Sequence, residues 1–357
     1  MEQSAKTTTL HSVNALAQLR DWAGRLGISL PGLAAIVLLL VLPLIPPFNQ
    51  EHILRWLVSA ALIAAQAIAF DFTTGYINVV NFGFAAFFGI GAYTSGLLAV
   101  NFGWSPWVTI FIGVLPAAIV GLLLGLLTLR LRGIFAAVMA WFVGLAVLGL
   151  TRNLVDLTRG PMGLSTPRFF ENPSNLPYFY TIVGMMLITY FVLRGIVSSH
   201  YGLAFRAIGQ NFDAAKASGI NPTYYRVFNF TVQTMFAGWL GGFYAHYFGI
   251  LTPAVMLTSR TVEVLAVAYI GGRGSLWGPA FIAFPFLFLM EYLRSNLSNL
   301  PGLHLVLYGL LLILVMIFYP GGFAQFYHSI RRRFGLEKAT DQPPVPTETA
   351  QTTSTTD

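Results

Sequence analysis

The 357-residue chain is 56% hydrophobic and 15% aromatic, and only 9% of its residues are charged. Ordinary soluble domains carry roughly 25% charged residues, so this composition excludes a soluble globular protein. The net charge of +7 comes from basic residues that lie mostly between apolar stretches, which indicates membrane orientation rather than nucleic-acid binding. Cysteine is absent, which excludes disulfides, thiolate metal sites and cysteine nucleophiles.

Ten apolar segments predict an all-α polytopic membrane protein with about ten transmembrane helices, because ~20 apolar residues cross a bilayer. The segment 1–32 precedes them without the cleavage signature of a signal peptide, so we expect it to be retained as a cytoplasmic segment. The transmembrane domain is expected over 33–320. Its predicted crossings are 33–48, 53–70, 76–100, 106–129, 134–150, 178–194, 227–249, 262–271, 277–293 and 304–319.

The distribution of Lys and Arg sets the expected orientation, because these residues concentrate in cytoplasmic loops. Ten crossings with both termini cytoplasmic place most of the basic residues inside. Segment 262–271 is too short to span alone, but omitting it would move Arg331, Arg332 and Arg333 outside. We therefore count it as a crossing, completed by residues of 250–261.

The last segment, 321–357, is expected to be a basic and then disordered cytoplasmic tail. It begins with the basic run, and its later part is rich in Pro, Thr, Glu, Gln and Ser without apolar periodicity. Such a composition cannot bury a core.

No energy source is visible in the sequence. None of the three lysines lies in a P-loop, so ATP would have to act through a partner. The charged or titratable candidates in the apolar segments are Glu263, Glu291 and His246, each expected near an external helix end as an interfacial or hydrogen-bonded group. No hydrolytic or metal-binding motif is present, so we expect a transport protein rather than an enzyme.

Glycine and asparagine interrupt two apolar segments, one in each half of the chain. Such paired interruptions indicate a substrate path between inverted repeats, here the halves 53–150 and 227–319. The alternative is that the glycines only allow helices to pack closely. The candidate path residues are Asn78, Asn81, Gly83, Gly89, Gly91, Gly271, Gly272 and Gly274.

The internal loop 201–222 is expected to form a short cytoplasmic helix. Asp213 is a plausible N-cap, Ala214–Ser218 favour helix, Gly219 can end it in the left-handed conformation and Pro222 prevents its continuation. Such a helix is suited to lie in a groove on another protein and transmit motion. A solvated connector is the alternative.

Asp213-Ala214-Ala215, followed by Gly219 after three intervening residues, resembles the EAA-x3-G loop of permease subunits in ABC importers, with Asp in place of the usual Glu. Over about residues 50–322 the chain is similar to the membrane permease of high-affinity branched-chain amino acid importers. The pattern that carries this similarity comprises Arg206-Ala207-Ile208, Gly219-Ile220-Asn221, Asn81-Phe82-Gly83, the segment 85–93 and the segment 271–279. Two positions depart from it: Phe84 replaces the usual His, and Asn81 replaces a small or hydroxyl residue.

The resemblance implies one subunit of a permease heterodimer in a prokaryotic cytoplasmic membrane. Its partners would be a second homologous permease, two cytosolic ATPases that bind ATP and Mg, and an external solute-binding protein. The chain itself would bind no cofactor or metal. Expected substrates are branched-chain or other small amino acids, with urea or short amides as alternatives in the same family.

Two other classes of transport protein stay open. A passive channel would work without ATPase partners, and a secondary transporter would depend on an ion gradient.

The resemblance also gives roles to two groups of residues. The residues expected to couple to the ATPases are Arg206, Asp213, Ala214, Ala215 and Gly219. Those expected to dock the binding protein on the external loop are Arg152, Arg159 and Arg168.

Overall fold

The computed structural model describes residues 30–46, 48–127, 131, 134–172, 174–296 and 321–333, with a few positions between 306 and 317. The described chain is helical apart from one antiparallel pair of two-residue strands, in which Leu164 of β1 (Leu164–Ser165) lies opposite Leu251 of β2 (Ile250–Leu251). Five described helical stretches are long and apolar enough to cross a membrane. They are α3 (Glu51–Thr74), α4 (Phe84–Phe102), the pair α5 (Pro106–Ile112) and α6 (Val114–Leu127), α7 (Ile134–Asn153) and α9 (Leu176–Ser198).

The remaining elements complete a helical membrane protein, as the sequence predicts. The predicted crossing 304–319, residues 1–29 and the tail after residue 333 lie outside the described residues, apart from the few positions named above. The count of ten crossings, the orientation of the termini and the inverted repeat therefore stay predictions. The other helices are α2 (Leu30–Val41), α8 (Val155–Thr158), α10 (His200–Gln210), α11 (Phe212–Ala217), α12 (Pro222–Phe248), α13 (Thr258–Gly271), α14 (Trp277–Asn296) and α16 (Gly322–Arg333), with short 3-10 turns η1 (Leu42–Leu44), η3 (Gly160–Met162) and η4 (Pro253–Met256).

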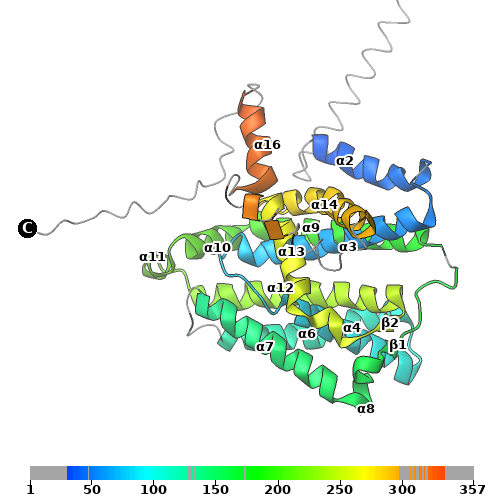
Figure 1. Ribbon diagram of the computed structural model, residues 1–357. Helices are drawn as coiled ribbons and strands as arrows, with labels where there is room; N and C mark the ends of the chain where they lie inside the picture. The colour runs from blue at the N-terminus through cyan, green and yellow to red at the C-terminus, as the bar shows by residue number, and fades with distance from the viewer. Residues whose placement is uncertain are drawn as a thin grey trace, which may run out of the picture.

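The long helices run side by side, with α12 packed against α3, α4 and α6 (Figure 1). Helices α10 and α11 lie at one end of this bundle, called here the α11 end, and β1 and β2 lie at the other, called the sheet end. The predicted internal loop 201–222 and the predicted external loop, which carries Arg152, Arg159 and Arg168, thus lie at opposite ends.

One predicted crossing is broken near its start. The helix expected over 76–100 begins only at Phe84, and residues 75–83 before it are not helical. Asn78 adopts a left-handed conformation (φ 60°), and the Asn81 side chain accepts the backbone N–H of Gly83 at 3.1 Å. Asparagine tolerates this conformation and caps backbone groups locally, which explains why the helix starts late. The crossing expected over 106–129 is one apolar stretch, Pro106–Leu127, in which Gly113 between α5 and α6 keeps a helical conformation (φ −58°, ψ −20°).

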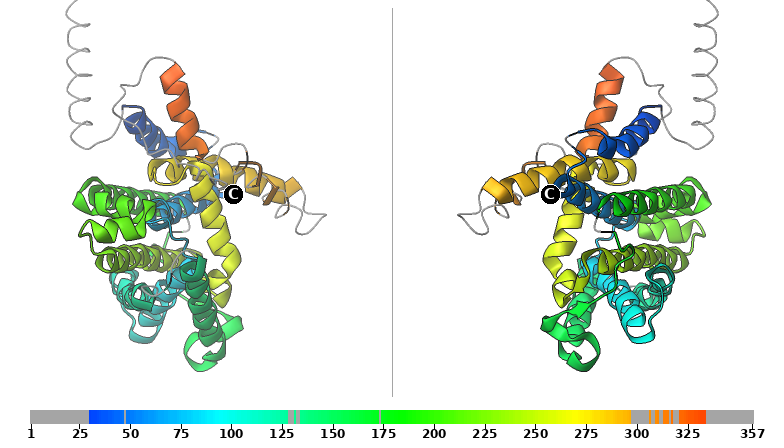
Figure 2. Two further views of the ribbon diagram at one scale, coloured as in Figure 1. Left: turned by 90° about the vertical axis from the view of Figure 1, so that its left-hand side faces the viewer. Right: turned by 90° about the vertical axis from the view of Figure 1, so that its right-hand side faces the viewer.

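The short segment predicted at 262–271 is the end of α13. Before it, β2 and η4 lead from the sheet end into the bundle, where Pro253, Val255 and Met256 are buried. Gly89 of α4 leaves space for the Met256 side chain. Helix α13 then crosses the long helices obliquely instead of running along them (Figures 1 and 2).

A polar seam joins α12 to α3 and to the segment before α4. The Asn81 side chain donates to Gln233 Oε1 at 2.8 Å, and Gln233 Nε2 donates to the Phe70 carbonyl at 3.4 Å. Asn229 Nδ2 donates to the Phe72 carbonyl at 3.0 Å. All three polar side chains are fully buried. Interhelical hydrogen bonds of this kind hold helices together in lipid, where apolar burial between helices gives little net drive.

Close glycine contacts bring α4 and α12 together. A Cβ at Gly91 would overlap the carbonyl oxygen of Gly238, and a Cβ at Gly241 would overlap that of Phe88. Neighbouring helices approach this closely only where the facing residues on both helices are small.

We expect Gly91→Ala to lower the free energy of unfolding by about 1–3 kcal/mol, the usual cost of overpacking. Gly184→Ala on α9 is the matched control, because a Cβ there meets no atom within 4 Å. Thermal unfolding of the two purified variants in detergent measures the difference. Equal midpoints would contradict this account of the α4 and α12 contact.

Candidate functional site

The predicted internal helix exists as α11, and its borders come from local capping. The Asn211 side chain accepts the backbone N–H groups of Asp213 at 3.1 Å and Ala214 at 3.0 Å, so Asn211 is the N-cap. The sequence-based choice of Asp213 as N-cap was wrong, and this residue lies in the first turn. Gly219 ends the helix with a φ of 85°, as predicted.

Helix α11 presents most of its surface to the outside of the chain. Ala215 is buried against the bundle, whereas Asp213, Ala214 and Gly219 are exposed. Figure 1 shows α11 protruding at the end of the bundle. Of the predicted coupling residues, the structure brings Asp213, Ala214 and Gly219 together on one accessible helical turn, whereas Ala215 faces the bundle and Arg206 lies on α10.

Helix α10 connects α11 to the bundle through aromatic packing. Phe205 is fully buried, and its ring lies 5.6 Å from that of Phe72 on α3 and 6.4 Å from that of Phe228 on α12. Tyr201 stacks on Phe228 at 4.9 Å. Because buried aromatic side chains pack in fixed geometries, α10 is held firmly against the ends of α3 and α12.

Tyr76, directly after α3, lies between α10 and the glycine-rich segment 271–274. The guanidinium of Arg206 sits over its ring at 5.5 Å, and a Cβ at Gly209 would overlap its carbonyl oxygen. The Tyr76 hydroxyl donates to the Gly274 carbonyl at 2.7 Å. One residue therefore contacts both α10 and the turn after α13.

Asp71 fixes the same turn from inside the bundle. Its side chain is fully buried, and its two carboxylate oxygens accept the backbone N–H groups of Gly274 at 2.8 Å and Leu276 at 3.0 Å. Gly274 (φ 74°) and Leu276 (φ 56°) are left-handed. Leucine rarely adopts this conformation, so the surrounding contacts must hold the turn in place.

The predicted path residues do not all lie together. Asn78 lies at the α11 end, where its side chain accepts from Arg273 at 3.4 Å. Asn81 is buried in the polar seam, and Gly83, Gly89 and Gly91 pack closely against Ala140, Met256 and Gly238 respectively. Of the second group, Gly271 packs against α14, Gly272 against α16 and Gly274 against Gly75.

At the sheet end a buried histidine ties the predicted external loop to α12. His246 Nδ1 lies 2.7 Å from the Pro167 carbonyl, which can only accept, so this nitrogen carries the proton. The hydroxyl oxygens of Ser95 and Thr109 lie 2.9 and 3.2 Å from Nε2, whose one lone pair can accept a hydrogen bond from this pair. His246 is thus a hydrogen-bonded structural group, one of the two roles expected for it.

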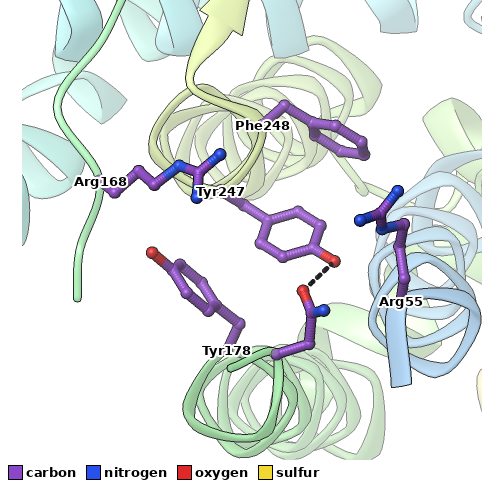
Figure 3. A pocket seen from close by; sticks show the side chains of 6 residues that line it. Arg55, Arg168, Tyr178, Tyr247 and Phe248 are labelled. Carbon is purple, nitrogen blue, oxygen red and sulfur yellow. Dashed lines mark hydrogen bonds between the residues drawn. The ribbon is translucent and has the colours of Figure 1, made fainter. Parts of the chain in front are cut away.

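A cavity of about 230 Å³ lies at the sheet end between α3, α9 and α12 (Figure 3). The Tyr247 hydroxyl donates to Asn175 at 3.0 Å, and Asn175 donates to Glu51 at 2.6 Å, which links the three helices. The cavity is lined by Arg55, Arg168, Asn175, Tyr178, Tyr247 and Phe248. Of the predicted docking residues, Arg168 lines this cavity, and Arg152 and Arg159 are exposed elsewhere at the same end. Two guanidiniums facing one cavity favour an anionic group.

Sequence reasoning missed Asp71 and Tyr76. A signal for Asp71 was present, because it is a carboxylate at the end of an otherwise apolar run, and charges in such positions usually serve a specific role. No comparable signal marks Tyr76, since its partners Arg206 and Gly274 lie far away in the sequence.

Comparison with known proteins assigns the family. The model of the family described as branched-chain amino acid transport system, permease component, matches residues 52–316. The chain is 27% identical over 316 residues to the high-affinity branched-chain amino acid transport system permease protein LivM of Escherichia coli (strain K12), covering 80% of this chain and 73% of LivM. LivH of the same strain is 24% identical over 287 residues, covering 72% of this chain and 90% of LivH.

A third relative is named for a different substrate. The nucleoside ABC transporter permease protein NupC of Lactococcus lactis subsp. cremoris (strain MG1363) is 26% identical over 223 residues, covering 55% of this chain and 69% of NupC. No solved structure matches the chain significantly. Because the family model covers most of its length, this multi-pass membrane chain belongs to the family of permease components of branched-chain amino acid transport systems.

Proposed function

We propose that this permease forms one half of the translocation path of an ATP-driven importer for branched-chain or other small amino acids. A second, homologous permease forms the other half, as the two relatives LivM and LivH suggest. Two cytosolic ATPase subunits bind ATP and Mg, and an external solute-binding protein delivers the substrate. The complex lies in a prokaryotic cytoplasmic membrane, with the α11 end inside.

The observation that carries this proposal is the continuous contact from α11 to α13. Helix α11 is exposed for a partner, α10 is packed on α3 through Phe205, and Tyr76 contacts both α10 and Gly274. A displacement of α11 by an ATPase therefore reaches the turn at the end of α13 without crossing a loose segment. A passive channel has no use for such a connection.

This connection supports an alternating-access mechanism. Helix α13 crosses the bundle and is bounded by left-handed residues at its C-terminal end, Gly272 and Gly274. Glycine permits the backbone rotations that a moving helix end requires. Binding of ATP in the partners favours one arrangement of α13, and its hydrolysis favours the other. A ligand shifts such an equilibrium only by its differential affinity for the two states.

At the opposite end, the cavity of Arg55 and Arg168 gives the binding protein a place to dock. Both side chains are exposed and come from different segments, α3 and the loop before α9. An acidic side chain of the binding protein would pair with them, and Arg152 and Arg159 would add weaker contacts at the rim.

Coupling is tested by Gly219→Pro and Asp213→Arg in the reconstituted complex. Proline cannot adopt the φ of 85° at Gly219, and Arg reverses the charge of the exposed first turn. We expect ATP hydrolysis stimulated by the binding protein to fall to the basal rate in both variants, and ATP-dependent leucine uptake to be lost. Gly184→Ala is the control. Stimulated hydrolysis at the wild-type rate in both variants would reject the coupling role of α11.

Asp71→Asn tests the connection between α10 and α13. The amide keeps the size of the side chain but offers a donor toward a backbone N–H, which leaves a buried group unpaired at a cost of about 1–3 kcal/mol. We expect fewer leucine molecules transported per ATP hydrolysed, with the complex still assembled. Tyr76→Phe, which removes one hydroxyl, should give a smaller loss. An unchanged transport ratio in Asp71→Asn would show that the turn does not transmit motion.

A further inference from the structure

A charged pair lies on the outer face of α13. Arg260 Nη1 donates to Glu263 Oε2 at 2.9 Å, and the two side chains are 55% and 30% exposed. The sequence suggested that Glu263 lies near the external end of a helix. The contacts of the neighbouring residues instead place Glu263 at the middle depth of the bundle.

These contacts put the start of α13 at the middle depth of the bundle. Thr261 accepts the backbone N–H of Ala85, in the first turn of α4, at 3.0 Å. Thr258 accepts from the indole of Trp141, near the middle of α7, at 2.9 Å. Figure 1 shows α13 passing the long helices away from both of their ends.

A charged pair at this depth cannot face lipid without a large cost, so it marks a surface that protein or water covers. Helices α6 and α7 expose large apolar side chains, among them Ile119, Leu123 and Phe142. The face of α13 is thus distinct from the lipid-facing surface and is the one suited to line a path beside the second permease.

The pair retains capacity to bind a further molecule. A guanidinium has five donors and a carboxylate about four acceptor positions, and the hydrogen bond between Arg260 and Glu263 uses one of each. Ser259 beside them is exposed. When empty, the pair neutralises itself, which limits the cost of placing it inside a membrane.

We propose that Arg260 and Glu263 form a subsite for a zwitterionic amino acid on its way through the permease. The guanidinium binds the α-carboxylate and the Glu263 carboxylate binds the α-ammonium, so the substrate replaces the internal ion pair with no change in net charge. The inference rests on the proposed function and specifies the chemistry of its substrate. Urea and ordinary nucleosides lack this pair of opposite charges and would not satisfy the site.

The test uses the complete complex in proteoliposomes with its binding protein, ATP and radiolabelled L-leucine. We expect Arg260→Gln and Glu263→Gln each to lower leucine uptake at least about tenfold, because each removes a charge-assisted hydrogen bond to the substrate. ATP hydrolysis stimulated by the binding protein should stay within about twofold of wild type, because the α11 contacts are unchanged.

The chain supplies a matched control. Arg294 and Glu291 of α14 form an ion pair with the same spacing, at 3.4 Å and with exposures of 60% and 30%. The double variant Glu291→Gln with Arg294→Gln should transport leucine normally. Exchanging the two charges of the α13 pair, Arg260→Glu with Glu263→Arg, separates the roles. If the pair is only structural, the exchange restores it and leucine uptake recovers. If the pair binds substrate, leucine uptake stays low.

Labelling gives a second readout, because the chain contains no cysteine. A charged methanethiosulfonate reagent should modify Ser259→Cys in the assembled complex, more slowly during leucine transport, and should leave Leu123→Cys on α6 unmodified. Wild-type uptake in Arg260→Gln, recovery in the charge exchange, or no labelling of Ser259→Cys would each overturn the subsite. If the unaltered complex shows no ATP-dependent uptake of leucine or of any other small amino acid, the proposed function fails. Leucine protection of Ser259→Cys then still decides whether the subsite exists.

Discussion

The hydrogen bonds between the buried Asp71 carboxylate and the backbone of the turn at 274–276 support the arrangement of the α11 end. A carboxylate in a membrane protein needs internal partners, and here two backbone N–H groups supply them at 2.8 and 3.0 Å. The same bonds hold the left-handed Leu276 and join α3 to the turn between α13 and α14. Without them, neither the turn nor its contact with Tyr76 would have a defined position.

The two ends of helix α13 make different kinds of contact. Its C-terminal end is held by Asp71 and Tyr76 beside the coupling helices, and its N-terminal end carries the Arg260 and Glu263 pair at the middle of the bundle. If both proposals hold, one rigid helix links the contact with the ATPase partner to the contact with the substrate.

The sequence predicted the features of the fold and the site that depend on residues close together in the chain. Apolar length indicated the membrane helices, and glycine at position 219 indicated the left-handed end of α11. It did not predict the N-cap at Asn211, since Asp213 has an equally suitable side chain and only backbone geometry separates them. Nor could it place Arg260, because its depth depends on the path of residues 250–257 through the bundle. The role of Asp71 likewise arises from partners about 200 residues away.

Movement of α13 relative to the bundle is the central claim, and a distance measurement tests it most directly. Spin labels at Ser259→Cys on α13 and Gly149→Cys on α7 can be placed in this naturally cysteine-free chain. In the complete complex, the distance distribution between the labels should shift when ATP and the binding protein are added, and Asp71→Asn should suppress the shift. An identical distribution with and without ATP would contradict the account.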